Sequence, residues 1–166
     1  MAQQRIVVLT GAGISAESGV RTFRDGDGLW EEHRLEDVAT PEAWMNDPVL
    51  VWRFYQARRR QVLEVEPNAA HLALADFASK REHFTLITQN VDDLHERAGN
   101  TNTIHMHGRL MTLRCEQTGR NEVRIEEADL GDEFLVCQCC ATPQRLRPDI
   151  VWFGEMPMQI EEIYAA

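Results

Sequence analysis

A glycine-rich turn that directly follows a short apolar run is the feature that most constrains the fold of this chain. Residues 5–10 read Arg-Ile-Val-Val-Leu-Thr, a β-branched run typical of a buried strand. Gly11, Gly13 and Ala16 follow at the spacing Gly-x-Gly-x-x-Ala and open a predicted helix. Glycines at these positions allow a tight turn and let the backbone approach a pyrophosphate, whose charge the helix N-terminus stabilises. The pattern predicts a nucleotide-binding turn, with a glycine turn that binds no ligand as the alternative.

Beyond this turn, strand-like and helix-like segments alternate along the chain. Thr40 followed by Pro41 is typical of a helix start, and Asn68 can cap another helix. Between them, apolar residues recur at helical spacing from residue 48 to about residue 65. Strands that alternate with helices favour a parallel α/β sheet. Further strands are predicted at residues 83–88, 103–107 and 149–153, and a short helix at residues 91–98.

Composition limits the kinds of protein that this chain can be. Its 166 residues are enough for one domain, and 43% hydrophobic with 27% charged residues excludes wholesale disorder. The 27 acidic residues outnumber the 17 Lys and Arg, and the net charge of −10 argues against a general nucleic-acid binder. No apolar run approaches the ~20 residues of a membrane helix, and the N-terminal residues lack the layout of a signal peptide. We therefore expect a cytoplasmic protein that binds neither membranes nor nucleic acids directly.

Four cysteines lie close together in the last third of the chain, and in a reducing cytosol such a cluster favours a metal site over disulfides. Cys137-x-x-Cys140, with Cys115 earlier in the chain, resembles half of a paired zinc ribbon and predicts these three residues as zinc ligands. A full ribbon would have a fourth ligand near position 118, but Thr118 is a poor one. Cys139, a histidine or water could complete the site instead.

The cysteine stretch also interrupts the alternation of strands and helices. Residues 115–148 are rich in charges, cysteine and proline and are expected to be irregular. We therefore predict a small zinc module at residues 113–148, inserted into a nucleotide-binding domain made of residues 1–112 and 149–166. The fold class predicted is α/β, a parallel sheet with a small inserted zinc-binding module.

Polar and aromatic side chains occur at two places where a nucleotide could contact the chain. The loop at residues 21–30 contains Arg24, which could contact a phosphate, and Trp30, which could cover a flat ring. A surface loop without a ligand is the alternative. Asn90 and Asp92 follow a predicted strand, and the carboxyl ends of parallel strands are where α/β folds bind ligands. These two side chains could hold an amide or a ribose, although Asx residues also cap helices.

Two pairs of side chains have the chemistry of a reaction site. His105 and His107 would face one side of a strand and suit a metal, whereas in a loop only one of them need face a site. Imidazole is well suited to accept a proton from a hydroxyl, with a structural histidine as the alternative. Tyr55 and Arg58 share one face of the predicted helix and together would recognise a carboxylate. The arginine run that begins at Arg58 makes a basic, solvated helix face the alternative.

Five short motifs follow one another along the chain. They are residues 11–19 (GAGISAESG), 21–24 (RTFR), 88–92 (TQNVD), 105–108 (HMHG) and 151–155 (VWFGE). Taken together, these motifs resemble the sirtuin family of NAD-dependent protein lysine deacylases. Tyr55 and Arg58 also match the acyl-pocket pair of the bacterial class III deacylases. The resemblance runs from residue 6 to the end of the chain.

The resemblance implies a Rossmann-like domain that carries the zinc module, with NAD and an acyl-lysine peptide meeting in the cleft between them. It implies that His107 is the general base, that Tyr55 and Arg58 accept an acidic acyl chain such as succinyl, and that Val151 and Phe153 pair with the substrate peptide. The implied activity removes acetyl and succinyl groups and yields nicotinamide, O-acyl-ADP-ribose and free lysine. The motifs and the resemblance together predict as NAD contacts Gly11, Ala12, Gly13, Ala16, Arg24, Trp30, Gln89, Asn90 and Asp92.

Members of this family continue past residue 166 with strands that complete the sheet and a Gly-Thr-Ser turn that holds the adenosine half of NAD. The resemblance therefore implies a C-terminally truncated chain, which would bind NAD poorly and turn over little by itself. Two other functions remain open at this point. One is a noncatalytic module that binds NAD or ADP-ribose, and the other is a zinc-stabilised interaction domain.

Overall fold

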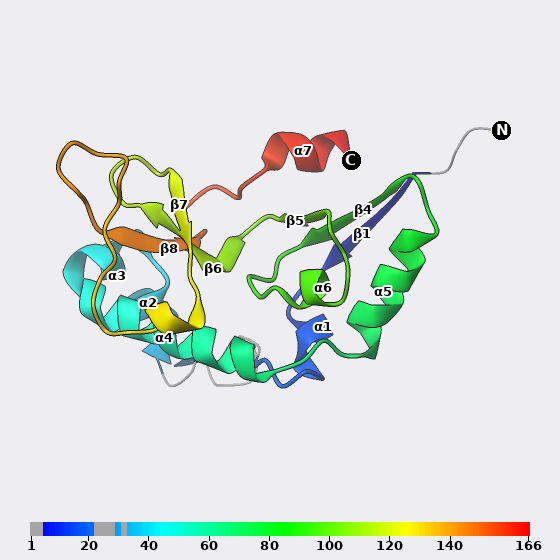
Figure 1. Cartoon of the computed structure of the whole chain (residues 1–166), viewed down its shortest axis with the longest axis horizontal. Helices are drawn as coiled ribbons and strands as arrows, with labels where there is room; N and C mark the ends of the chain where they lie inside the picture. The colour runs from blue at the N-terminus through cyan, green and yellow to red at the C-terminus, as the bar shows by residue number, and fades with distance from the viewer. Residues whose placement is uncertain (1–4, 22–28, 31–32) are drawn as a thin grey trace.

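The structure is a computed structural model that describes residues 5–21, 29–30 and 33–166 (Figure 1). Its strands are β1 (Ile6–Thr10), β2 (Leu29–Trp30), β3 (His33–Arg34), β4 (Phe84–Thr88), β5 (Thr103–His105), β6 (Gly108–Cys115), β7 (Asn121–Arg124) and β8 (Leu146–Ile150). Its α-helices are α1 (Gly13–Ala16), α2 (Leu35–Val38), α3 (Pro41–Asn46), α4 (Pro48–Glu64), α5 (Ala69–Ser79), α6 (Leu94–Arg97) and α7 (Ile160–Ala165). A short 3₁₀ helix spans Glu127–Asp129.

A three-stranded parallel sheet forms one half of the molecule, on the right of Figure 1. β4 lies between β1 and β5, and the register aligns Thr10 with Thr88 and Thr88 with His105. The three strands therefore end at the same edge of the sheet. At this edge the glycine turn, the segment after Thr88 and the segment that contains His107 come together. The parallel α/β arrangement predicted from the sequence is confirmed.

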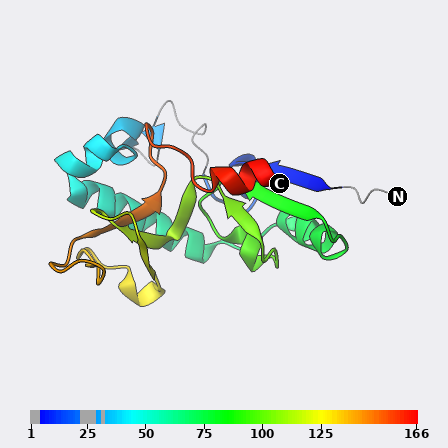
Figure 2. The same cartoon turned by 90° about the horizontal axis from the view of Figure 1, so that it is seen from above.

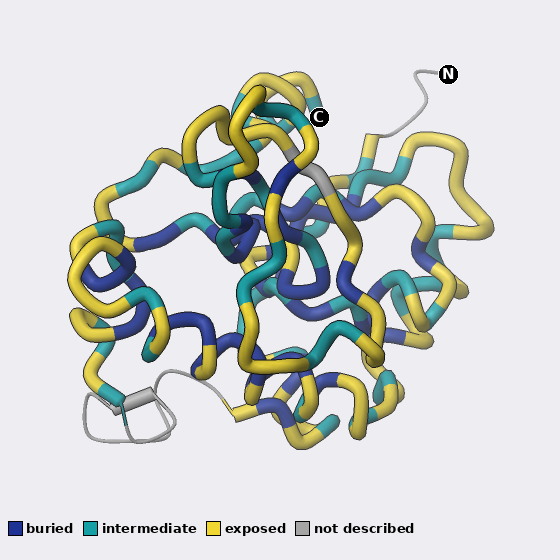
Figure 3. Tube along the Cα trace, turned by 60° about the vertical axis from the view of Figure 1, so that its left-hand side comes forward, coloured by how far each residue is buried: buried dark blue, intermediate teal, exposed yellow. Residues whose placement is uncertain are grey.

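A second, antiparallel sheet has the strand order β7-β6-β8 and forms the other half. Helices α2, α3 and α4 lie against it, and α4 continues toward the parallel sheet (Figures 1 and 2). The main hydrophobic core lies between these helices and the second sheet, with Trp44, Trp52, Tyr55 and Trp152 among its buried side chains. Burial of such large side chains from water is the main favourable contribution to folding. The peripheral loops are largely exposed (Figure 3).

The predicted helix starts are confirmed by their capping bonds. The Thr40 hydroxyl accepts the Ala43 N–H at the start of α3. At the start of α4, Pro48 takes the first position and the Asp47 carboxylate accepts a backbone N–H. Asn68 caps α5 through its side-chain oxygen. Such caps satisfy N–H groups that have no partner within the helix, so they set where each helix begins.

Three predictions about the later strands are corrected by the structure. The strand predicted at residues 149–153 is β8, Leu146–Ile150, because β6 pairs with that segment and the chain then leaves the sheet. The strand predicted at residues 103–107 ends at His105, because the chain turns at the next two residues. The stretch at residues 115–148, expected to be irregular, contains β7 and the start of β8. No helix in the described part of the chain has the length and apolar character to cross a membrane.

Candidate functional site

A pocket of about 440 Å³ opens at the carboxyl edge of the parallel sheet. Its walls come from the turn after β1, the segment after β4, the turn before β6, the segment after β8 and one face of α4. Ligand sites of small molecules typically enclose roughly 300–1,000 Å³, so the pocket is large enough for one. The predicted site residues that line it are Ala12, Tyr55, Arg58, Gln89, Asn90, Asp92, His107, Val151 and Phe153.

The other predicted NAD contacts lie near the pocket or outside the residues that the structure describes. Gly11, Gly13 and Ala16 belong to the turn that forms one wall, but Ala12 and Ser15 are the turn residues that line the pocket. Arg24 lies outside the described residues. Trp30 belongs to β2, and its side chain lies outside the described part of the structure.

A buried serine, absent from the sequence prediction, connects the glycine turn to the strand ends. The Ser15 hydroxyl donates to Asp92 Oδ2 at 3.0 Å and accepts from Asn90 Nδ2 at 2.9 Å. His71 Nδ1 accepts the Asn68 N–H at 3.3 Å, so its proton lies on Nε2, which is 3.4 Å from the Ser15 hydroxyl. Ser15 thus accepts twice and donates once. Because Ser15 lies inside the glycine motif, the sequence could have identified it as a pocket residue.

Asp92 accepts a backbone N–H at the start of α6 and also lines the pocket. Its Oδ1 accepts the Leu94 N–H at 3.2 Å at the start of α6, and its Oδ2 accepts the Ser15 hydroxyl. Burial raises the pKa of this carboxyl above its ordinary value, although the bonds from Leu94 and Ser15 oppose that shift. The carboxylate lines the pocket from a fixed position.

The two histidines of the HMHG motif have different surroundings. His107 lies in the turn after β5 and lines the pocket, where its Nδ1 donates to the Gln89 carbonyl at 3.0 Å. Its Nε2 is then the proton-accepting nitrogen. His105 is buried, with Nδ1 3.0 Å from the Asn90 carbonyl and Nε2 2.7 Å from a Glu96 carboxylate oxygen. Both of its nitrogens are engaged, which excludes the alternative of a metal-binding histidine pair.

Tyr55 and Arg58 project from α4 into the same pocket. Both are buried, and so is Arg59, so the alternative of a basic solvated helix face is wrong for these positions. The Tyr55 oxygen accepts a hydrogen bond from the Trp152 indole at 3.0 Å. Burial raises the pKa of Tyr55 far above its ordinary value, so its phenol is protonated at neutral pH. A phenol O–H and a guanidinium in one pocket are suited to a carboxylate.

The four cysteine sulfurs lie within 4.8 Å of one another, and none of these four residues is joined in a disulfide. Cys140 Sγ is 3.7 Å from both Cys115 Sγ and Cys139 Sγ. Four thiolates around zinc at a bond length of ~2.3 Å are spaced about 3.8 Å apart, so the cluster fits a tetrahedral zinc site. Cys139 lies in the cluster with the three predicted ligands and is suited to the fourth position that the sequence left open. The Thr118 hydroxyl lies 3.3 Å from its sulfur.

Comparison with known proteins supports the sequence resemblance. The profile of the Sir2 family matches residues 11–166. An NAD-dependent protein deacylase of Shigella flexneri is 59% identical over 169 aligned residues, which cover 100% of this chain and 61% of the relative. A protein of the same name from Escherichia coli strain K12 is also 59% identical, with 60% of its length covered.

Solved structures agree with this assignment. A Sir2 homologue in complex with NAD superposes with a TM-score of 0.81 and 45% identity, covering 94% of this chain and 60% of the other. A mutant Sir2 homologue in complex with ADP-ribose gives a TM-score of 0.84 and 42% identity, covering 99% of this chain and 64% of the other. The chain thus spans about three fifths of the length of these relatives.

The parallel sheet with a pocket at its carboxyl edge defines a Rossmann-like α/β protein. Within this class, the cysteine cluster beside the second sheet and the order of the motifs are typical of one family. The chain belongs to the Sir2 family.

Proposed function

We propose that this protein is an NAD-dependent protein lysine deacylase that removes acetyl and succinyl groups. One pocket contains both a histidine whose Nε2 accepts protons and a tyrosine–arginine pair suited to a carboxylate. This observation carries the proposal. The names of the Shigella flexneri and Escherichia coli relatives support the deacylase activity. The removal of succinyl groups rests on Tyr55 and Arg58 alone.

The pocket residues fit the nicotinamide and ribose part of NAD. Ser15, Asn90 and Asp92 form a buried hydrogen-bonded group at the pocket wall, which is what a polar ligand at a strand end requires. When bound, NAD supplies an electrophilic ribose carbon and nicotinamide as the leaving group. We propose as its contacts Gly11, Ala12, Gly13, Ala16, Arg24, Trp30, Gln89, Asn90 and Asp92.

The remaining pocket residues act on the acyl-lysine peptide and on protons. His107 Nε2 accepts the proton of a hydroxyl that attacks the acyl carbon, while the Gln89 carbonyl holds the ring in the required tautomer. Val151 and Phe153 pair with the substrate backbone. Their own N–H groups bond to the carbonyls of His107 and Ala39, which fixes the segment beside the pocket. The expected products are free lysine, nicotinamide and O-acyl-ADP-ribose.

The cysteine cluster is proposed to bind zinc in a structural role, because none of the four cysteines lines the described pocket. With it we propose a division into a zinc module at residues 113–148 and a nucleotide-binding domain at residues 1–112 and 149–166. We also propose a cytoplasmic location, in line with a cysteine cluster suited to a metal and with the bacterial relatives.

Two acyl-lysine peptides of identical sequence, one acetylated and one succinylated, test the function. The protein is purified in the full length that its gene encodes and incubated with NAD and each peptide. Free lysine peptide and nicotinamide, measured by mass spectrometry, should form in equal amounts. Binding of NAD without formation of either product would contradict the proposal and favour a noncatalytic NAD-binding module.

A further inference from the structure

Trp152 donates a hydrogen bond to Tyr55 and thereby fixes the hydrogen-bonding role of that phenol in the pocket. Its indole Nε1–H donates to the Tyr55 oxygen at 3.0 Å, and the two side chains are 2% and 0% exposed. An indole N–H can only donate, so in this bond the phenol oxygen can only accept. The phenol must then direct its own O–H proton elsewhere. A carboxylate is an acceptor without protons at neutral pH, so a tyrosine held in this way is suited to donate to it.

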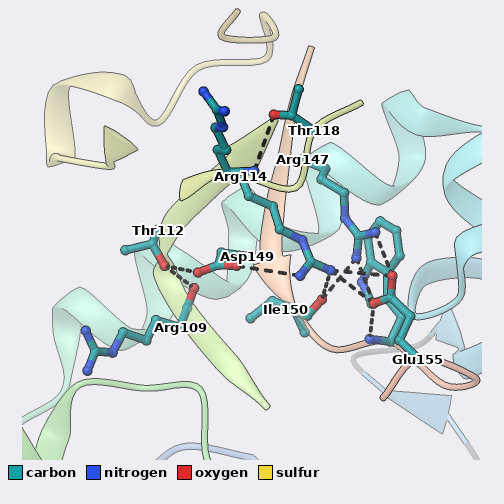
Figure 4. Close-up of polar contacts among 10 residues, drawn as sticks. Arg109, Thr112, Arg114, Thr118, Arg147, Asp149, Ile150 and Glu155 are labelled. Atoms are coloured by element: carbon teal, nitrogen blue, oxygen red, sulfur yellow. Dashed lines mark hydrogen bonds and ion pairs between the residues drawn. The ribbon is translucent and has the colours of Figure 1, made fainter. Parts of the chain in front are cut away.

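Two charged residues hold Trp152 in place. The Arg147 guanidinium lies 3.5 Å from the centroid of the indole ring. The Glu155 carboxylate accepts from Arg147 Nη1 at 2.8 Å and Nη2 at 2.9 Å, and also from the Trp152 backbone N–H at 2.8 Å (Figure 4). Glu155 therefore fixes both the guanidinium that covers the ring and the backbone that carries it. Bidentate pairs of this kind restrict geometry strongly.

A second arginine ties the same carboxylate to the sheet. Arg114, on β6, donates to Glu155 at 3.2 Å and lies 3.9 Å from the Asp149 carboxylate (Figure 4). Burial by itself would raise the pKa of Glu155, but the hydrogen bonds from Arg147 and from the Trp152 N–H outweigh burial and lower it. Glu155 is thus an anion that anchors the segment after β8 to the strands of the second sheet.

We propose that Trp152 is a positioning residue for acyl-chain choice: its N–H sets the Tyr55 hydroxyl as a donor toward acyl chains that end in a carboxylate. Arg147 and Glu155 keep the indole in the orientation that this requires. The inference rests on the proposed deacylase function and adds a determinant of specificity outside the tyrosine–arginine pair. Trp152 acts through Tyr55 and does not itself bind the acyl carboxylate.

The test replaces Trp152 by Phe, which keeps an aromatic ring under Arg147 and removes the indole N–H. KM and kcat are measured on matched succinyl-lysine and acetyl-lysine peptides with the full-length protein. Loss of a single hydrogen bond that orients the phenol should raise KM for the succinyl peptide about three- to tenfold relative to KM for the acetyl peptide. Trp44→Phe is the matched control. Trp44 lies in the same aromatic cluster, with ring centroids 5.9 Å from Trp152, but its indole donates to Glu116.

A double-mutant cycle separates positioning from simple packing. In a Tyr55→Phe background, Trp152→Phe should cause no further change in the ratio of the two KM values, because the hydroxyl that it positions is absent. Equal losses on both peptides, or an effect that adds to that of Tyr55→Phe, would overturn the inference. If Trp152→Phe does not fold, Glu155→Gln carries the same test, with the same ratio expected to shift in the same direction. Turnover of neither peptide by the unmodified protein would instead overturn the proposed function, and the inference with it.

Discussion

The Nδ1–H of His107 donates to the backbone carbonyl of Gln89 over 3.0 Å, and this bond decides which nitrogen of the ring can take up a proton. Gln89 directly follows β4, and its own N–H bonds to the Thr10 carbonyl at 2.9 Å at the end of the neighbouring strand. The proposed general base is therefore oriented by backbone groups of the parallel sheet.

Replacing His107 by Ala should abolish turnover and spare NAD binding. A positioned general base contributes roughly 10²–10⁴-fold to the rate, so deacylation should fall by at least about 100-fold. Product formation is followed by mass spectrometry, and NAD binding by calorimetry. Turnover within tenfold of the unmodified protein would show that another group accepts the proton.

The tyrosine–arginine pair should control succinyl removal more than acetyl removal. Arg58→Met keeps the length of the side chain and removes its charge, and loss of a charged hydrogen bond costs about 1.5–3 kcal/mol. Desuccinylation should therefore fall about 10- to 100-fold in kcat/KM, with a much smaller loss of deacetylation. Arg60→Met, on an exposed position of α4 two residues away, is the control. Equal losses of both activities in Arg58→Met would argue against recognition of a carboxylate.

All four cysteines should be needed for metal binding. Cys139→Ser and Cys140→Ser should each lower the zinc content of the purified protein and its melting temperature, because their sulfurs belong to one cluster. A strong chelator should lower the melting temperature of the unmodified protein in the same way. Zinc is measured by elemental analysis. Thr118→Ala, next to Cys139, should keep its metal, and retention of zinc by Cys139→Ser would remove that residue from the ligand set.

The buried His95 should make the protein less stable in mild acid. Burial lowers its pKa from 6.5 to about 4, and the nearby His71 adds to this shift. The unfolded chain therefore takes up a proton below pH 6.5 that the folded chain takes up only near pH 4. Stability that is present above pH 6.5 is lost as the pH falls toward 4, by about 3 kcal/mol.

This contribution is isolated by comparison with His95→Gln, which carries no titrating group at this position. Urea unfolding at pH 7 and pH 4.5 should show a smaller loss of stability for the variant than for the parent. An identical loss in both proteins would assign the acid sensitivity to other groups. The half-buried carboxylate of Glu155 is among them, because its lowered pKa also makes the fold less stable in acid.

Gly108 should not tolerate a side chain. Its φ is +84°, and a Cβ there would lie 2.0 Å from the Asp149 carbonyl oxygen of the paired strand. Because neither backbone can move without breaking the β6–β8 pairing, Gly108→Ala should lower the free energy of unfolding by about 3 kcal/mol or more. Gly119 has a φ of +69° with nothing within 4 Å, so Gly119→Ala should cost only ~1 kcal/mol. Equal losses of melting temperature in the two variants would mean that the positive φ, and not the clash with Asp149, causes the loss of stability.

Several features were predictable because they depend on neighbours in the sequence. The strand before Gly11, the cap at Asn68 and the helical spacing of Tyr55 and Arg58 follow from local propensity and periodicity. The end of β8 was misplaced because Val151 and Phe153 look like strand residues. Their N–H groups bond outside the sheet, to His107 and Ala39, and no local pattern reports such partners.

The amino-acid sequence by itself determined the α/β class, the helix starts and the glycine turn after the first strand. It also determined which histidines and cysteines could accept protons or bind a metal. These are properties of short segments. Only the tertiary structure placed His107 at the pocket and His105 in a buried contact with Glu96. It also brought Cys139 into the cluster and joined Tyr55 to Trp152. The physical reason is distance along the chain. Trp152 and Tyr55 are 97 positions apart, and a hydrogen bond between them exists only after two sheets and α4 have packed together.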